Sequence, residues 1–328
     1  MTSEFHFELP EALIAQEPPA ERGASRMLVV DRRTGTWSDR WFRDLPAYLG
    51  PGDCLVLNNS RVFPSRLFGK RPGGDSAVEV FLLRPLKGDG SLWEALVRPG
   101  RRLQVGQRVD FEGGLGADIV ARGEFGERTL RFQGEGDLLQ KIEAIGHVPL
   151  PPYIKRPDTA QDRERYQTVF ARESGSVAAP TAGLHFNAEV LEACKATGAD
   201  RAMVTLHVGL GTFQPVRGEK LHSERFHVGE EAAAKIKAAA RVVCVGTTSV
   251  RTVESWMLGR QNETDLFIRP GFAFQKTGAM LTNFHLPESS LLMLVCTFGG
   301  ADLVLGAYRH AVEAGYRFYS YGDCMLVV

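Results

Sequence analysis

A histidine at the end of a proline- and glycine-containing turn is the first candidate for proton transfer. His185 closes the segment 179–185, in which small and turn-forming residues allow backbone to approach a ligand closely. An imidazole exchanges protons near neutral pH and is the most frequent general base in enzymes. His185 is therefore a candidate base, and the same segment supplies two candidate substrate contacts, Thr181 and Gly183. The alternative is a buried histidine with one hydrogen bond and no chemistry.

Two further clusters combine histidines with glycine, hydroxyl and amide groups. His207 follows an apolar segment and precedes a glycine-rich stretch containing Thr212, whereas Asn283 and His285 stand in a turn before the apolar run 291–298. Both clusters are typical of pocket linings at the ends of strands. The alternative is that they are tight connections whose side chains satisfy backbone groups.

The segment 241–251 predicts a strand, a glycine turn and a helix start rich in hydroxyl groups. Backbone N–H groups at a helix start lack intrahelical partners and bind anions, so a carboxylate or a phosphate would fit there. The segment is neither a Walker loop nor a dinucleotide-binding glycine motif. A capped helix without a ligand is the alternative. The candidate substrate contacts are Gly246, Thr247, Thr248, Ser249 and Arg251.

Polar and basic residues follow the apolar strand predicted at 54–57. Asn58, Asn59 and Arg61 could bind a nucleoside or ribose at a domain junction, or could belong to a hydrogen-bonded linker. Basic residues concentrate in the segment that follows, and we expect four of them to bind RNA phosphates. The alternative is that they are exposed loop residues without a binding function. These four are Arg66, Arg98, Arg101 and Arg102.

The order of the predicted elements indicates two domains. The chain has 328 residues, which exceeds the size of most single cores. Short alternating strands and 15 of the 35 glycines fall within 61–150, which predicts an inserted antiparallel β-barrel. Helical patterns and strands elsewhere, including 27–31, 241–245 and 291–298, predict an α/β domain built from both ends of the chain, 1–60 and 151–328.

Composition excludes several classes of protein. A net charge of zero argues against indiscriminate coating of nucleic acid, which relies on an excess of Lys and Arg. Five scattered cysteines without a Cys-x-x-Cys pair favour neither a disulfide framework nor a zinc knuckle, and the spacing of His222, Glu224 and His227 does not suit a metal. We expect a cytoplasmic protein without a metal or a membrane segment, because no signal peptide or long apolar run is present.

Together these clusters resemble a known family. The chain is similar from end to end to the S-adenosylmethionine:tRNA ribosyltransferase-isomerases of the queuosine pathway, through motifs that include FHFELPEALIAQ, LVLNNSRVFPSRL, SVAAPTAGLHF, VTLHVGLGTFQPVR, VGTTSVRTVES, LTNFHLPESSLLMLV and YRFYSYGDCMLV. The motifs occur in order at fitting spacings. Gly278 and Cys324 stand where this family commonly carries an acidic residue and an alanine, and neither position has a predicted role.

The resemblance implies a transferase that consumes S-adenosylmethionine as a substrate. Its ribosyl group would be transferred to 7-aminomethyl-7-deazaguanine at the wobble position of tRNA and isomerised, giving epoxyqueuosine-tRNA, adenine and methionine. No further cofactor is implied. The resemblance also implies an α/β domain with an inserted β-barrel, in agreement with the composition. We expect the anticodon stem-loop as the RNA partner, and a monomer without an obligate protein partner.

Side-chain chemistry then suggests roles within this reaction. The candidate bases are His185, His285 and His207, with Asp323 in reserve. The helix start at 246–251 suits the methionine carboxylate of the donor, and Asn58, Asn59 and Asn283 suit its ribose or purine.

Two other functions remain open on the sequence. An S-adenosylmethionine-dependent RNA methyltransferase would release S-adenosylhomocysteine, whereas the ribosyl transfer would release adenine and methionine. A non-catalytic RNA-binding module would act on neither donor nor tRNA.

Overall fold

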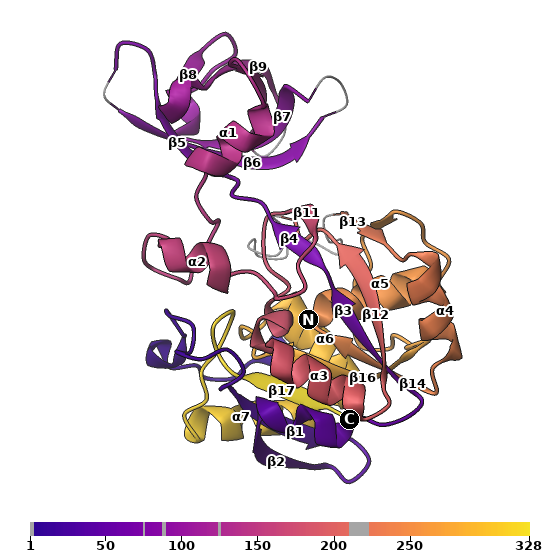
Figure 1. Cartoon of the computed structure of the whole chain (residues 1–328). Helices are drawn as coiled ribbons and strands as arrows, with labels where there is room; N and C mark the ends of the chain where they lie inside the picture. The colour runs from indigo at the N-terminus through magenta and orange to yellow at the C-terminus, as the bar shows by residue number, and fades with distance from the viewer. Residues whose placement is uncertain (1–2, 75, 87–89, 124–125, 210–222) are drawn as a thin grey trace. The chain divides into compact units, whose positions relative to one another are not determined.

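The computed structural model describes residues 3–74, 76–86, 90–123, 126–209 and 223–328 (Figure 1). The chain divides into two compact units. The first contains residues 1–61, 151–156 and 164–328, and the second contains residues 62–150 and 157–163. The segment that forms the second unit therefore interrupts the segment that forms the first.

A mixed β-sheet is the centre of the first unit, with the strand order β15-β13-β12-β3-β14-β16-β17-β1-β2. Strands β12, β3, β14 and β16 are parallel, β17 and β1 run in the opposite direction, and β2 and β13 are antiparallel to their neighbours. The strands are β1 (Arg26–Asp31), β2 (Thr36–Trp41), β3 (Asp53–Asn58), β12 (Asp200–Leu206), β13 (Glu224–His227), β14 (Arg241–Val245), β15 (Glu263–Thr264), β16 (Thr277–Asn283) and β17 (Cys324–Val327). A separate pair joins β4 (Ser60–Val62) to β11 (Glu173–Ser176).

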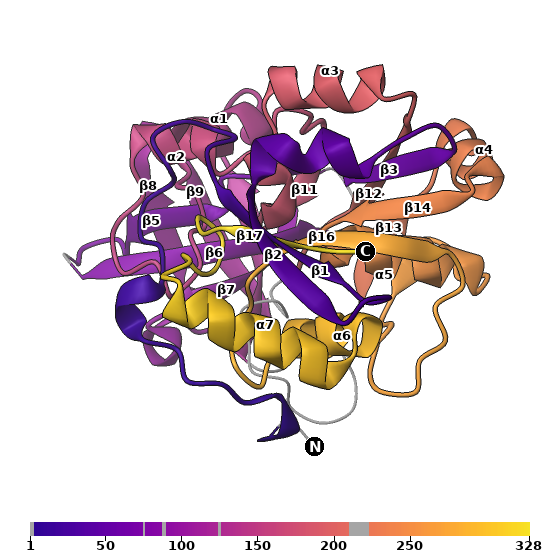
Figure 2. The ribbon, with the colours of Figure 1, turned by 90° about the horizontal axis from the view of Figure 1, so that it is seen from below.

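Helices cover both faces of this sheet, so the central strands are apolar at nearly every position. Successive side chains of a strand point to opposite faces. Leu55 and Leu57 of β3 pack in one core cluster with α3 (Ala188–Ala196), whereas Cys54 and Val56 pack in the other with α4 (Glu230–Ala238), α5 (Thr247–Met257), α6 (Ser290–Gly299) and α7 (Ala301–Glu313). Figure 2 shows α3 on one side of the sheet and α6 and α7 on the other.

Short 3₁₀ helices occur between the strands and α-helices. They are η1 (Ser3–Phe5), η2 (Glu11–Leu13), η3 (Phe42–Tyr48), η4 (Gly100–Arg102), η5 (Glu112–Gly114) and η7 (Thr181–His185). Phe42 of η3 and Ala182 of η7 pack in the same cluster as α3, so these turns belong to that layer. The turn that carries His185 is therefore fixed against the sheet by its apolar neighbours.

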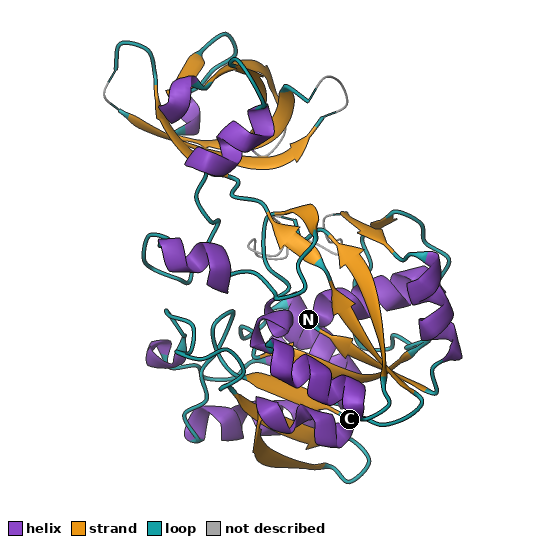
Figure 3. Ribbon diagram, viewed as in Figure 1, coloured by secondary structure: helices purple, strands orange, loops and turns teal. Residues whose placement is uncertain are grey.

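The second unit is a closed antiparallel barrel with the strand order β10-β7-β6-β5-β8-β9 (Figure 3). Its strands are β5 (Arg66–Lys70), β6 (Ala77–Pro85), β7 (Leu92–Arg98), β8 (Arg108–Phe111), β9 (Gly116–Arg122) and β10 (Glu127–Gln133). Helix α1 (Leu138–Ile145), capped by Asp137, places Ile142 in the barrel core. Helix α2 (Ala160–Arg165) follows in the chain.

The predicted fold class is confirmed, with one wrong element. The sequence predicts a strand at 291–298, where the structure has helix α6, whose residues are buried on nearly all sides against the sheet and α7. A helix that is apolar all round has no polar face to reveal its period, so an apolar run of this length fits either structure. The predicted domain boundaries at 60/61 and 150/151 stay a prediction.

Among the residues that the structure describes, no single helix is long and apolar enough to cross a membrane. Helices α6 and α7 are long and apolar enough only when taken together, and they are bent by 117° where they meet.

Candidate active site

Most of the predicted site residues gather at one edge of the sheet in the first unit. Asn58 ends β3, Gly246 follows β14 and Asn283 ends β16, and these three strands are parallel. Strands β1 and β17 begin at the same edge, because Cys324 pairs with both Asn283 and Met27. The carboxyl ends of parallel strands are where open α/β sheets bind ligands.

His185 is held at this edge with one ring nitrogen unoccupied. The residue is 4% exposed, and Nδ1 lies 2.8 Å from Oγ of Ser25. Nε2 is buried and has no hydrogen-bond partner among the described residues. Burial lowers the pKa of His185 to about 4, and the neighbouring side chain of Asn283 acts in the opposite direction. The imidazole is therefore neutral at neutral pH.

Asn283 is a second residue with an unused polar atom. Its Nδ2 donates to the backbone carbonyl of Tyr319 at 2.9 Å, whereas its Oδ1 is buried without a hydrogen-bond partner in the described part of the chain. The side chain lies beside the His185 ring and favours its protonated form. When both ring nitrogens of His185 carry protons, the oxygens of Ser25 and Asn283 are available as acceptors. The arrangement suits a base that takes up a proton during a reaction.

The other two candidate histidines differ from His185. Nε2 of His285 lies 2.8 Å from Oγ1 of Thr282, and burial lowers the pKa of His285 to about 3. His207 is only partly buried, and burial followed by the charge of Arg225 lowers its pKa. Its Nδ1 is buried without a partner among the described residues. The structure thus places all three imidazoles in the first unit, and His185 is the one that is 4% exposed, anchored through Nδ1 and left with a buried Nε2 that has no partner among the described residues.

Asp323 has a defined role in the fold. Its two carboxylate oxygens accept hydrogen bonds from the backbone N–H groups of Arg26 and Arg317, each at 2.8 Å. These bonds tie the start of β1 to the turn that precedes β17. Burial raises the pKa of Asp323. With both oxygens occupied by backbone, a proton-transfer role for this carboxyl group stays a prediction.

The start of helix α5 has the predicted strand, turn and helix geometry. Gly246 has a φ of +87°, a value that glycine adopts without strain. Ser249 donates to the carbonyl of Val245, and Thr248 accepts from the amide of Asn58 at 3.3 Å. The first N–H groups of a helix have no intrahelical acceptor, so this end of α5 retains donors for an anion.

Arg251 is a predicted substrate contact that the structure shows as an anchor of α5. It is buried, its guanidinium is paired with the buried carboxylate of Glu224 on β13, and its Nε donates to the carbonyl of Leu266 at 3.1 Å. Thr247 is buried at the helix start. A contact between Arg251 and a substrate stays a prediction.

The asparagine pair after β3 is bonded to the protein. Asn58 donates to the carbonyl of Leu206 at 3.0 Å and accepts from the N–H groups of Ser60 and Leu206, which joins β3 to β12. Oδ1 of Asn59 accepts from the hydroxyl of Thr205 at 2.7 Å. Arg61 is exposed.

The remaining predicted contacts have different environments. Thr181 is half-buried in η7. A Cβ on Gly183 would lie 2.7 Å from the methyl group of Thr168, so this glycine allows close packing of protein segments. Thr212 lies outside the described residues.

The predicted RNA-binding arginines lie on the barrel. Arg66 is paired with Glu79 at 2.7 Å, whereas Arg98 and Arg101 are exposed. The side chain of Arg102 lies outside what the structure describes. Exposed guanidinium groups without a nearby carboxylate are the better candidates for phosphate contacts.

Sequence reasoning missed two residues of this edge, Ser25 and Tyr319. Ser25 contacts His185 across 160 positions of sequence, and Tyr319 contacts Asn283 across 36. Tyr319 lies within the motif YRFYSYGDCMLV, in which nothing distinguishes it from the neighbouring tyrosines, and no motif marks Ser25. Within the described ranges, no group of three or more His, Cys, Asp or Glu side chains is arranged to hold a metal ion.

Comparisons with known proteins agree with this architecture. A family model described as queuosine biosynthesis protein matches residues 2–327. The S-adenosylmethionine:tRNA ribosyltransferase-isomerase of Solibacter usitatus is 62% identical over 99% of both chains, and that of Heliobacterium modesticaldum is 50% identical over 99% of this chain and 98% of the relative. The crystal structure of the S-adenosylmethionine tRNA ribosyltransferase of Thermotoga maritima is 39% identical with a TM-score of 0.57, covering 99% of this chain and 100% of that one. The chain therefore belongs to the queuosine biosynthesis family of S-adenosylmethionine:tRNA ribosyltransferase-isomerases, and it is an enzyme of the transferase class.

Proposed function

We propose that this enzyme transfers and isomerises the ribosyl group of S-adenosylmethionine onto 7-aminomethyl-7-deazaguanine at the tRNA wobble position. The products are epoxyqueuosine-tRNA, adenine and methionine, and the reaction takes place in the cytoplasm. Family membership supports the reaction class. The single observation that carries the chemistry is the buried, neutral imidazole of His185, with Nε2 unoccupied at the ligand-binding edge of the sheet.

The reaction needs a base that removes a proton from a carbon atom. The sulfonium of the donor acidifies the neighbouring 5′ C–H bonds, so a positioned base can remove one of these protons. The electron pair left on C5′ forms a double bond to C4′ and breaks the C4′–O4′ bond, and the ring oxygen then forms a carbonyl group at C1′ and displaces adenine. The amine of the modified base then adds to C4′ and loses a proton, and C5′ closes a five-membered carbon ring onto C1′. The resulting alkoxide displaces methionine from C5′ and forms the epoxide. The first step requires a proton acceptor close to the 5′ carbon and a site that excludes water.

His185 is better suited to the role of general base than His285 and His207 are. Its ring is desolvated, which keeps it neutral and keeps water away. The oxygens of Ser25 and Asn283 can both accept from the ring once it is protonated. His285 already directs Nε2 to Thr282, and His207 is partly solvent-exposed.

The donor would lie along the same edge. The N–H groups at the start of α5 would bind the methionine carboxylate, because the helix dipole favours negative charge there. Asn283, with its unoccupied Oδ1, would contact the ribose or purine, whereas the amide of Asn58 is already bonded within the sheet.

We further propose that the barrel contacts tRNA through exposed arginines. An anticodon loop presents unstacked bases that can be extruded into a pocket, whereas its stem offers mainly phosphates. Arg98 and Arg101 would hold phosphates and contribute position rather than sequence specificity.

Product analysis tests this function. The purified enzyme is incubated with S-adenosylmethionine and a tRNA that carries 7-aminomethyl-7-deazaguanine, and free adenine and the digested nucleosides are followed by mass spectrometry. Adenine, methionine and a nucleoside with the mass of epoxyqueuosine are expected. S-adenosylhomocysteine with a methylated nucleoside would show a methyltransferase instead.

A further inference from the structure

The turn between α7 and β17 contains a buried tyrosine whose hydroxyl group is unused. Tyr319 is 6% exposed, and its OH is buried without a hydrogen-bond partner among the described residues. The hydroxyl groups of Tyr153, Tyr308 and Tyr316 each have a partner. A buried polar group without a partner costs free energy, so its retention calls for an explanation.

The backbone of Tyr319 is unusual as well. Its φ of +71° lies in the left-handed region, which large side chains rarely adopt. Three hydrogen bonds hold it there. Its N–H donates to the carbonyl of Phe284 at 3.2 Å, and its carbonyl accepts from Asn283 Nδ2 and from the N–H of Gly322, both at 2.9 Å. Strained residues that are fixed in this way cluster at functional sites.

The side chain of Tyr319 is fixed by stacking. Its ring lies on the ring of Tyr153, with centroids 4.2 Å apart and an angle of 20° between the planes. Tyr153 is in turn hydrogen-bonded to Oγ of Ser320 at 2.6 Å. The phenol is therefore preorganised, and a ligand would gain its hydrogen bond without ordering the side chain.

We propose that Tyr319 is a further substrate-binding residue, whose hydroxyl group hydrogen-bonds the ribosyl part of S-adenosylmethionine beside Asn283. This inference rests on the proposed function. The side chain of Asn283 donates a hydrogen bond to the backbone carbonyl of Tyr319, and each residue keeps one side-chain polar atom without a partner among the described residues: an amide oxygen and a phenol oxygen.

The chemistry of the two groups favours the ribosyl part of the donor. Burial raises the pKa of Tyr319, so the phenol is neutral and can donate. An amide oxygen that accepts and a phenol that donates complement ribose hydroxyl groups, each of which donates and accepts. The charged ends of the donor are better matched by a helix start.

The test uses Tyr319→Phe in the full-length enzyme, with S-adenosylmethionine affinity measured by calorimetry and the Tm measured without ligand. We expect affinity to fall roughly tenfold, as for the removal of one hydrogen bond. We also expect the Tm to stay equal to that of the wild type or to rise, because the variant no longer buries an unpaired hydroxyl group. A merely structural hydroxyl group would give a lower Tm.

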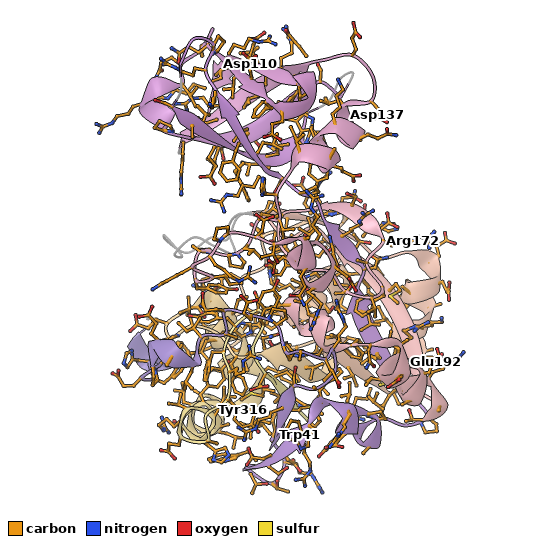
Figure 4. The ribbon with its side chains drawn as sticks, turned by 60° about the vertical axis from the view of Figure 1, so that its left-hand side comes forward. Trp41, Asp110, Asp137, Arg172, Glu192 and Tyr316 are labelled. Atoms are coloured by element: carbon orange, nitrogen blue, oxygen red, sulfur yellow. The ribbon has the colours of Figure 1, made fainter. Side chains whose placement is uncertain are left out.

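Tyr316→Phe is the matched control. Tyr316, labelled in Figure 4, is also buried, but its OH donates to Asp39 at 2.5 Å. This variant should have a lower Tm and keep its affinity for S-adenosylmethionine. A donor analogue without one ribose hydroxyl group should bind the wild type about as weakly as the normal donor binds Tyr319→Phe.

The possible results separate this inference from the proposed function. Equal affinity of the wild type and Tyr319→Phe for S-adenosylmethionine would overturn the inference and leave the proposed function intact. A wild-type enzyme that neither binds S-adenosylmethionine nor releases adenine in the presence of substrate tRNA would overturn the proposed function itself.

Discussion

The chemistry assigned to His185 depends on the surroundings of its two ring nitrogens. Ser25 fixes the orientation of the ring through Nδ1, and the centroid of the ring lies 5.4 Å from that of Phe42. Nε2 has no hydrogen-bond partner among the described residues, although the side chain of Asn283 lies close enough to favour its protonation. An oriented imidazole with a ring nitrogen free of hydrogen bonds can approach a C–H bond without first losing a partner, and acceptors beside the ring stabilise the proton that it takes up.

Replacing the ring should stop catalysis and spare binding. His185→Gln removes the proton acceptor and keeps a side chain of similar length, so we expect adenine release in single-turnover experiments to fall by about 10²- to 10⁴-fold. The affinity for S-adenosylmethionine should change by less than about threefold, because the imidazole acts mainly in the transition state.

His227→Gln is the control, because His227 is exposed on β13. It should release adenine at the rate of the wild type. Near-normal turnover of His185→Gln would assign the base to another residue.

The pH dependence of turnover follows from the same burial. A general base acts in its deprotonated form, and the pKa of His185 in the folded enzyme is lowered to about 4. The active form is therefore fully present well above that pKa, and kcat/KM should show no loss from this group between about pH 5.5 and 7.5. A decrease on acidification with an apparent pKa near the ordinary value for histidine would instead indicate that a group other than His185 is the base.

The sequence indicated which residue types could belong to the site, but it did not indicate which residues they contact in the fold. His185 and Asn283 stand out because polar groups in glycine- or proline-containing turns often line pockets. Ser25 and Tyr319 were not singled out, because the contacts that give them a role join distant parts of the chain. Arg251 is a candidate substrate contact because of its position in the motif at 241–251. In the structure its guanidinium is paired with the buried carboxylate of Glu224.

Among the elements, α5 and β13 are joined by the buried ion pair of Arg251 and Glu224. Arg251→Met would leave the Glu224 carboxylate buried without its counter-charge, so the free energy of unfolding measured in urea should fall by about 3–5 kcal/mol. The double variant with Glu224→Gln should recover most of this stability.

The same double variant separates structure from binding. If it regains stability and binds S-adenosylmethionine as the wild type does, Arg251 serves only to anchor the helix. Weaker binding by a stable double variant would support the predicted substrate contact. A single variant within about 1 kcal/mol of the wild type would contradict the account of the ion pair.

Elements with a clear period or clear turn signals were predictable, and fully apolar ones were not. Strand β14 is predicted at Arg241–Val245 and is found there. Helix α6 is mistaken for a strand, because Leu292, Val295 and Phe298 are buried together with most of the residues between them. Only the packing against α7 and the sheet decides between the two structures.

For the whole molecule, the shift in composition correctly indicated a barrel inserted into an α/β fold. Glycine-rich turns between short strands distinguish the inserted segment, and apolar strands separated by helical patterns distinguish the rest. Which arginines of the barrel are paired with carboxylates and which are exposed could be determined only from the structure. Arg108 is paired with Asp110, labelled in Figure 4, whereas Arg101 is exposed.

Charge reversal on the barrel should weaken tRNA binding through electrostatics. Arg101→Glu should raise the Kd for substrate tRNA and lower the slope of log Kd against log salt by about 0.9 for each phosphate that the variant no longer neutralises. Lys195→Glu on α3 makes the same change in net charge at an exposed position of the other unit and should leave both values unchanged. An unaltered slope for Arg101→Glu would place the RNA-binding surface elsewhere.

We propose that the enzyme transfers the ribosyl group after a base removes a 5′ proton. The most direct test of this proposal supplies S-adenosylmethionine with deuterium at both 5′ positions, together with tRNA carrying 7-aminomethyl-7-deazaguanine, and determines the mass of the modified nucleoside. We predict a nucleoside with the epoxyqueuosine skeleton that retains a single deuterium, the other having passed to the base and then to water. A nucleoside that retains both deuterium atoms would exclude removal of a 5′ proton, and one that has gained only a methyl group would show methyl transfer instead.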